Sequence, residues 1–130
     1  MAQVTSPATS SASNRAAAGY LIAQAALVLG WWGAVFASQA VRGWFFPYGG
    51  LDPAFAAFVL PDLGFIVGGS LYVARKRFRG DPAARASGVL LGAVGYATVY
   101  TLGWTFALQA PAAGVLVMLV MSAGTFRACR

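Results

Sequence analysis

The sequence predicts an all-α integral membrane protein, a bundle of four transmembrane helices with both termini on the cytoplasmic side. The first observation is composition, since 59% of the 130 residues are hydrophobic and only 9% are charged. Soluble domains carry about 25% charged residues, so this chain has too little polar surface to cover itself in water. The second is a series of long apolar runs, and the third is a clustering of positive charge that fixes orientation.

The apolar runs divide the chain into a tail and a membrane domain. Residues 1–17 are rich in Ser, Thr and Ala and predict a disordered cytoplasmic tail, while residues 18–130 form the membrane domain. We expect spans at about residues 20–41, 54–74, 86–108 and 112–126. Cleavage of the first run as a signal peptide, after Ser38-Gln39-Ala40, is an alternative. However, the run from 20 to 41 is longer than the roughly 7–15 residues of a signal core.

Glycines recur at four-residue spacing inside these runs. Gly64 and Gly68 form one pair, Gly88 and Gly92 a second, and Gly30 lies on a stripe between Ala26 and Ala34. Small residues at this spacing let helix backbones approach closely in lipid. We therefore predict helix packing at Gly30, Gly64, Gly68, Gly88 and Gly92.

Aromatic and basic residues mark the predicted membrane boundaries. Trp44 and Tyr48 lie in the loop between the first two spans, where amphipathic rings typically anchor at headgroup depth. The loop itself is either such an anchor or a lid over a cavity in the bundle. A dense basic block follows the second span and predicts contact with anionic lipid: Arg75, Lys76, Arg77 and Arg79.

The topology follows from the distribution of all nine Lys and Arg residues. Four spans place the tail, the basic loop and the C-terminus on one side, and only Arg42 on the other. Positive charge accumulates on the cytoplasmic side of membrane proteins, so both termini are predicted to be cytoplasmic. The cytoplasmic set is Arg15, Arg75, Lys76, Arg77, Arg79, Arg85, Arg127 and Arg130.

Asp62 is the one ionisable residue inside the second apolar run. It is about 12 Å along the helix from Ala54, close to the bilayer midplane, where a charge costs at least about 2.5–3.5 kcal/mol. Pro61 removes a backbone hydrogen bond to Ala57 and predicts a kink. Alternatively, Pro61 and Asp62 begin a helix, with the preceding residues 51–60 re-entrant.

The candidate site combines Asp62 with some subset of the following polar and aromatic side chains from its own and other spans: Tyr96, Tyr100, Trp104, Ser70, Gln24 and Gln39. Tyr96, Tyr100 and Trp104 follow at four-residue spacing on one helix face, and Ser70 lies two turns beyond Asp62. Three roles remain open: a hydrogen-bonded tie between helices, a contact for a ligand or partner, or a group that transfers a proton or ion. Trp31 and Trp32 either pack within the bundle or line a ligand cavity.

The sequence lacks the residues that several kinds of chemistry require. The chain has no His and one Cys, Cys129, so no metal site and no bound cofactor is predicted, although a lipid or lipophilic pigment fits the composition. A serine nucleophile would find no His or Glu as its base. We therefore predict no catalytic residue, no enzymatic activity and no nucleic-acid partner. Cys129 is a reactive or lipidated thiol, or simply a terminal residue.

Three segments carry a family resemblance: WWGAVFASQAVRGWFFP, AFVLPDLGFIVGGSLYVA and GYATVYTLGW. They resemble four-helix membrane segments of bacterial proteins associated with isoprenylcysteine or phospholipid methyltransferase-like domains. The catalytic part has no counterpart in these residues. The resemblance thus implies an accessory half of a lipid-modifying enzyme and transfers no catalytic residue.

Together these observations predict a multi-pass protein of the bacterial inner membrane. It acts as a non-catalytic accessory or scaffold subunit, or holds a lipophilic ligand at Asp62. A small proton- or cation-coupled transporter that works as an oligomer is the alternative. The expected partners are membrane lipid and other membrane subunits or further copies of the chain.

Overall fold

The computed structural model describes residues 7–45 and 53–130, and every regular element within them is helical. In chain order the elements are α1 (Pro7–Ala37), α2 (Gln39–Phe45), α3 (Pro53–Ala56), α4 (Val59–Pro61), the π-helical segment η1 (Asp62–Gly68), α5 (Gly69–Arg79), α6 (Ala84–Leu108) and α7 (Ala113–Cys129). The all-helical prediction is confirmed for these residues.

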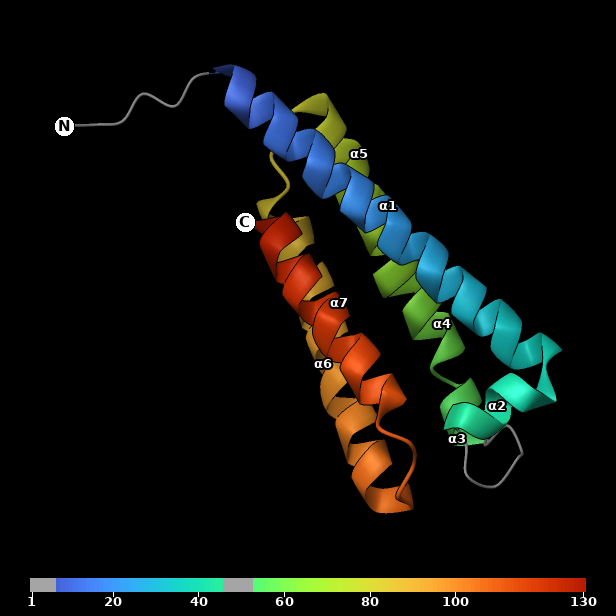
Figure 1. Ribbon diagram of the computed structural model, residues 1–130. Coiled ribbons are helices and arrows are strands. Elements are labelled where there is room, and N and C mark those ends of the chain that lie inside the picture. Colours follow the sequence, from blue (N-terminus) through green and yellow to red (C-terminus); the bar gives the residue numbers. More distant parts are fainter. Residues whose placement is uncertain (1–6, 46–52) are drawn as a thin grey trace.

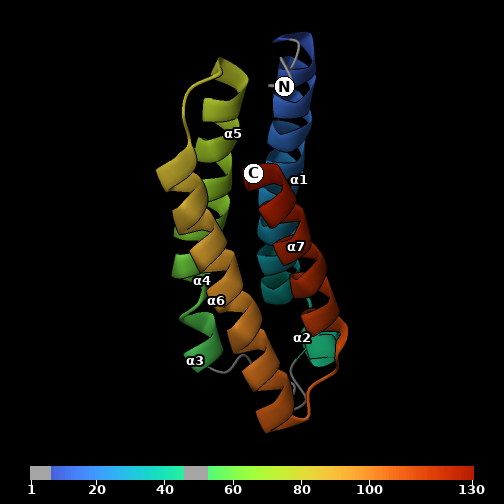
Figure 2. The ribbon, with the colours of Figure 1, turned by 90° about the vertical axis from the view of Figure 1, so that its left-hand side faces the viewer.

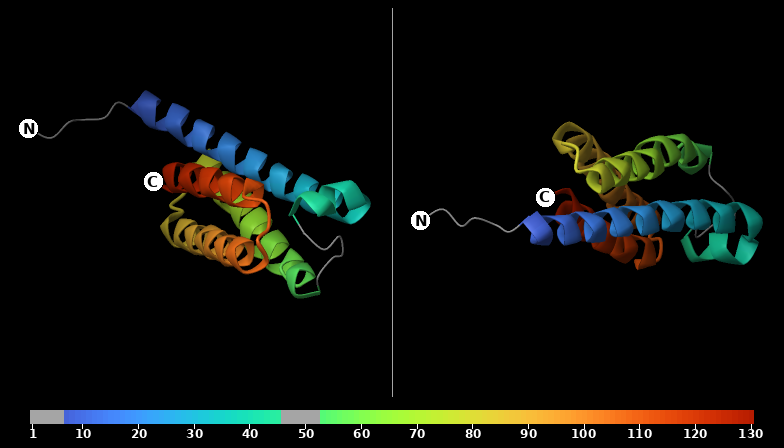
Figure 3. Two further views of the ribbon diagram at one scale, coloured as in Figure 1. Left: turned by 60° about the horizontal axis from the view of Figure 1, so that its bottom comes forward. Right: turned by 90° about the horizontal axis from the view of Figure 1, so that it is seen from above.

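The long elements run alternately up and down (Figure 1). α1 packs along α5 and η1 on one side and along α7 on the other, and α6 packs against α7, α5 and η1. Figure 2 and the end view in Figure 3 show the same neighbours. The start of α1, the α5–α6 connection and the C-terminus lie toward one end, whereas α2, α3 and the α6–α7 turn lie toward the other (Figure 1).

α1 begins much earlier than the sequence suggested. The tail predicted over residues 1–17 is helical from Pro7 onward, which corrects that prediction for the described residues. Ala16, Ala17 and Ala18 favour helix, and Asn14 Oδ1 accepts a hydrogen bond of 3.2 Å from Arg77 of α5. The helix therefore gains a partner where the sequence alone showed only small polar residues.

The buried face of α1 recurs at alternating steps of three and four residues. Its apolar members are Ala18, Leu21, Ala25, Val28, Trp32 and Val35. This spacing keeps one narrow seam toward the neighbouring helices. The predicted stripe of small residues lies elsewhere, since Ala26 and Gly30 are exposed.

α1 ends four residues before the predicted limit of the first span. Arg42 donates hydrogen bonds of 2.9 and 3.1 Å to the carbonyls of Val35 and Phe36, which lie in the last turn of α1. Ser38 Oγ accepts from the Val41 backbone N–H at 3.3 Å and so begins α2. The chain turns at this point (Figure 1).

The second predicted span is a composite of α4, η1 and α5. Pro61 has no N–H to donate, and the wider π-helical turns of η1 start at the next residue, Asp62. The sequence predicted a kink at Pro61, and the structure shows a change of helix type at this point. α3 is a separate short helix, so residues 53–56 do not continue into this segment.

The basic end of α5 closes with a Schellman motif at Gly80. Gly80 adopts a φ of 70°, its N–H bonds the Arg77 carbonyl at 3.2 Å, and the Asp81 N–H bonds the Lys76 carbonyl at 3.0 Å. Lys76 also lies 3.5 Å from the Asp81 carboxylate. This turn sends α6 back along the bundle, with the basic block at its corner.

Two helical stretches are long and apolar enough to cross a membrane, Ser11–Ala37 and Ala84–Leu108. The second matches the span predicted at 86–108 closely. Only 17% of the most apolar 18-residue stretch of this helix is buried, so most of its apolar side chains lie on the outside. The exposed large side chains include Phe106, at 82% exposure, and Val99, at 69%.

The predicted packing glycines do not make close contacts within this chain. A Cβ built at Gly30, Gly64, Gly88 or Gly92 would meet no atom of another element within 4 Å, and one at Gly68 meets only a Leu63 carbonyl of its own segment. Close approach occurs instead at Gly69, next to Leu90, and at Gly124, against the Tyr20 ring. Packing at the predicted positions stays a prediction for contacts with other molecules.

Candidate functional site

Asp62 lies at the first turn of η1 and is half-buried. Its Oδ2 accepts a hydrogen bond of 3.0 Å from the indole Nε1–H of Trp32, which is buried on α1. The bond ties η1 to α1, as the helix-tie hypothesis requires. A carboxylate can accept about four hydrogen bonds, because each of its oxygens has two lone-pair sites, and the indole N–H supplies one of them.

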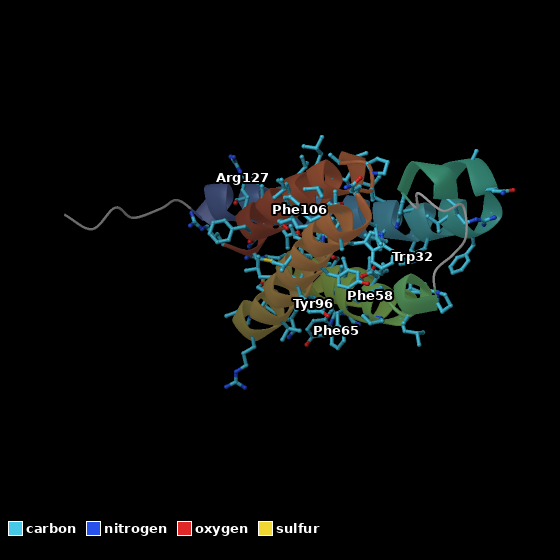
Figure 4. The ribbon with its side chains drawn as sticks, turned by 90° about the horizontal axis from the view of Figure 1, so that it is seen from below. Trp32, Phe58, Phe65, Tyr96, Phe106 and Arg127 are labelled. Carbon is cyan, nitrogen blue, oxygen red and sulfur yellow. The ribbon has the colours of Figure 1, made fainter. Side chains whose placement is uncertain are left out.

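A groove of about 270 Å³ lies between α6 and the α4–η1 segment, and Asp62 is part of its wall. From α4 and η1 the wall includes Pro61, Asp62, Phe65 and Ile66, with Phe58 just before α4; from α6 it includes Val89, Gly92, Ala93, Tyr96 and Ala97. Asp62 is the one charged residue among them, and the groove is open to the outer surface of the helices. Figure 4 shows Phe58, Phe65 and Tyr96 gathered between these elements, with Trp32 close by.

The three aromatic residues predicted on one face of α6 form a ladder. The ring centroids are 6.5 Å apart for Tyr96 and Tyr100 and 6.0 Å apart for Tyr100 and Trp104. Phe58 extends the ladder, with its ring 3.9 Å from Tyr100 and 6.4 Å from Tyr96. Only Tyr96 of the three α6 residues reaches the groove, so Tyr100 and Trp104 support its wall from the side.

Ser70 belongs to a different polar cluster. It accepts a 3.1 Å hydrogen bond from Gln24 Nε2, and Thr125 Oγ1 lies 2.6 Å from Gln24 Oε1. All three side chains are almost fully buried, and they join α1, α5 and α7. This arrangement is a structural tie, and it separates Ser70 from the Asp62 groove.

The basic block surrounds a second hollow at the end of α5. A space of about 220 Å³ is lined by Tyr72, Arg75, Lys76, Arg79 and Asp81. Arg77 points elsewhere, toward Asn14 of α1. The predicted interfacial anchors cannot be placed in the same way, because Tyr48 and the Trp44 side chain lie outside the described part of the chain.

The site offers few groups for chemistry. Within residues 7–45 and 53–130 no three His, Cys, Asp or Glu side chains gather as metal ligands. Asp62 and the Tyr96 hydroxyl are the titratable groups that line the groove. Cys129 is a half-buried free thiol at the opposite end of α7 from the α6–α7 turn.

Sequence reasoning missed three members of the site: Trp32 as the partner of Asp62, and Phe58 and Phe65 as aromatic walls. Trp32 did carry a signal, since it was one of two tryptophans deep in an apolar run. Phe58 and Phe65 gave none, because phenylalanine is ordinary in a membrane span and the wider turns of η1 determine where Phe65 points.

The chain matches no protein-family description, no curated protein and no solved structure. The resemblance to methyltransferase-associated membrane segments therefore stays a prediction. The groove and the residues that line it therefore carry the evidence for function.

Proposed function

We propose that this chain is a four-span membrane protein that holds a lipophilic ligand in the groove beside Asp62. In this role it is a non-catalytic subunit or carrier. The observation that carries the proposal is the groove itself, an opening lined by apolar and aromatic side chains with a single carboxylate. Ligand pockets typically combine such walls with a few polar groups that fix orientation.

The outward-facing side chains support a membrane location. Leu60, Phe65, Val99, Phe106 and Val120 all expose more than half of their surface. Isolated exposed apolar residues are normal in soluble proteins, but continuous apolar surface on several helices is typical of contact with lipid. α7, with 17 residues, is about 25 Å long and would require modest local thinning of the bilayer.

The charge distribution supports the orientation. The start of α1, the α5–α6 connection and the C-terminus share one end of the molecule (Figure 1), and eight of the nine Lys and Arg residues belong to these parts. Arg42 lies at the other end, on α2. We propose that the basic end is cytoplasmic and that the hollow between Arg75, Lys76 and Arg79 receives anionic lipid headgroups.

A second candidate, transport coupled to protons or cations, is favoured by one observation. The π-helical segment begins at Asp62, and such segments often mark hinges and functional sites. Solute flux in reconstituted vesicles that is abolished by Asp62→Asn without loss of fold would favour transport over simple ligand holding.

The proposed function is tested by filling the groove. Gly92 lines it, and a Cβ added there meets no atom of another element within 4 Å, so Gly92→Leu should fold normally while its side chain occupies the ligand space. Gly88→Leu, one turn away and equally unobstructed, lies outside the groove and is the matched control. The measurement is mass spectrometry of lipophilic compounds that co-purify with each variant.

Wild type and Gly88→Leu should retain the same compound in stoichiometric amounts, whereas Gly92→Leu should lose most of it. Equal retention by all three proteins would contradict ligand holding in this groove. Failure of wild type to retain any compound above the level of bulk lipid would also contradict it.

A further inference from the structure

We infer that the ligand of the groove is a hydrophobic organic cation, such as a lipophilic ammonium compound. This inference rests on the proposed function and specifies its ligand class. The deciding feature is that a carboxylate and three aromatic rings face the same small apolar space.

The first step concerns the charge of Asp62. Among the described residues the one ion pair joins Lys76 and Asp81, so Asp62 has no cationic partner there. Its carboxylate instead accepts a hydrogen bond from the neutral indole of Trp32. An ionised carboxylate in a medium of low dielectric constant is costly unless a positive charge lies nearby. A cationic ligand would supply that charge from within the groove.

The second step concerns the walls. Phe58, Phe65 and Tyr96 line the groove together with Asp62. The face of an aromatic ring carries negative potential and attracts an ammonium group within about 6 Å, most strongly where water is excluded. Rings and carboxylate therefore favour the same kind of ligand, one with positive charge beside an apolar body.

The third step excludes a metal ion as the occupant. Calcium takes about six to eight oxygen ligands and magnesium about six. The groove offers a single carboxylate, and the remaining wall residues are apolar or aromatic apart from the Tyr96 hydroxyl. An organic cation needs no such oxygen shell, and its apolar part would cover Val89, Ile66 and Ala93.

The test uses two probes that differ only in charge. One is (4-hexylbenzyl)trimethylammonium, and the other is its neutral isostere, in which carbon replaces the quaternary nitrogen. Equilibrium binding to the full-length protein in lipid nanodiscs is measured for each, with partition into empty nanodiscs subtracted. Wild type should bind the cation at least tenfold more tightly than the isostere.

Three variants separate the contributions. Asp62→Asn keeps an acceptor for Trp32 but removes the charge, so cation affinity should fall at least tenfold while isostere affinity is unchanged. Tyr96→Leu keeps an apolar wall but removes a ring, so cation affinity should fall several-fold. Phe106→Leu, an exposed aromatic position on α6 outside the groove, should bind both probes as wild type does.

The outcomes distinguish the inference from the function on which it rests. Equal binding of both probes, unaffected by Asp62→Asn but lost in Gly92→Leu, would overturn the cationic ligand and leave lipophile holding intact. Binding of neither probe, with wild type also free of co-purified ligand, would overturn both. If a second copy of the chain fills the groove, neither probe should bind, no ligand should co-purify, and the protein should form a stable dimer.

Discussion

At the scale of single residues, the polar side chains of this chain form hydrogen bonds in different places. Gln24, Ser70 and Thr125 bond one another in the interior, while Asp62 bonds Trp32 at the wall of the groove. Thr98 bonds the Val94 carbonyl of its own helix at 2.8 Å and also lies 2.7 Å from Ser122 Oγ on α7, whereas Thr101 bonds the Ala97 carbonyl at 2.7 Å. As Thr101 shows, a threonine in an apolar helix is not by itself a sign of contact between helices.

The first residue-scale prediction compares two threonines. Thr125→Val removes the hydroxyl that reaches Gln24 on α1, whereas Thr101→Val removes a hydroxyl that bonds the Ala97 carbonyl of its own helix. Interhelical hydrogen bonds in membranes contribute about 0.6–2 kcal/mol, so Thr125→Val should lower the free energy of unfolding by about 1 kcal/mol. Thr101→Val should be close to neutral.

The measurement is reversible unfolding of both variants in the same detergent. Equal stability of the two variants would mean that the contact between Gln24 and Thr125 contributes nothing to the fold. The volume of the side chain is conserved in both substitutions, so a difference reports the hydroxyl group.

At the scale of elements, the packing of α1 against α7 depends on one glycine. A Cβ on Gly124 would collide with the ring of Tyr20, whose hydroxyl donates a 3.0 Å hydrogen bond to the Met121 carbonyl. The glycine therefore leaves the space in which the ring crosses from one helix to the other. The glycines of α6, by contrast, have no atom of another element within 4 Å of such a Cβ.

Gly124→Ala should accordingly destabilise the protein by about 1–3 kcal/mol, because the ring must move and its hydrogen bond is lost. Gly95→Ala, in open space on α6, should change stability by less than about 1 kcal/mol or increase it, since alanine favours helix. A double variant identifies the ring as the cause. In the Tyr20→Leu background, Gly124→Ala should lower the free energy of unfolding only slightly. Additive effects in the double variant would contradict this contact.

The sequence located α6 well but predicted the contacts between elements poorly, for a physical reason. Apolar runs locate helices such as α6 within two residues, because length and hydropathy act locally. The predicted glycine pairs failed to identify contacts inside the chain, since every span offers several small residues and only the three-dimensional arrangement selects Gly69 and Gly124. Asp62 was found from its cost in lipid, but its partner Trp32 lies 30 positions away on another helix.

At the scale of the whole molecule, charge and apolar surface together define the proposed placement. The basic end carries the start of α1, the α5–α6 connection and the C-terminus (Figure 1). The groove is lined by α6 and the α4–η1 segment. Asp62 and Tyr96 then lie well inside the hydrocarbon layer. Ligand access would come sideways from the bilayer rather than from water.

Reporter fusions test the orientation. Green fluorescent protein joined after Arg130 should fluoresce in the cytoplasm, and alkaline phosphatase joined after Gln109, at the α6–α7 turn, should be active outside it. The reciprocal fusions should be inactive. An active alkaline phosphatase after Arg130 would contradict four spans with cytoplasmic termini.

The central claim is that the Asp62 groove faces the interior of a bilayer. The most direct measurement is electron paramagnetic resonance power saturation of spin labels in lipid vesicles, in a Cys129→Ser background. A label at Phe65, on the groove wall and 57% exposed, should collide readily with oxygen and hardly at all with a water-soluble nickel complex. A label at Arg79, at the basic end of α5, should show the reverse. Nickel access at Phe65 equal to that at Arg79 would show that water bathes the groove and would contradict the claim.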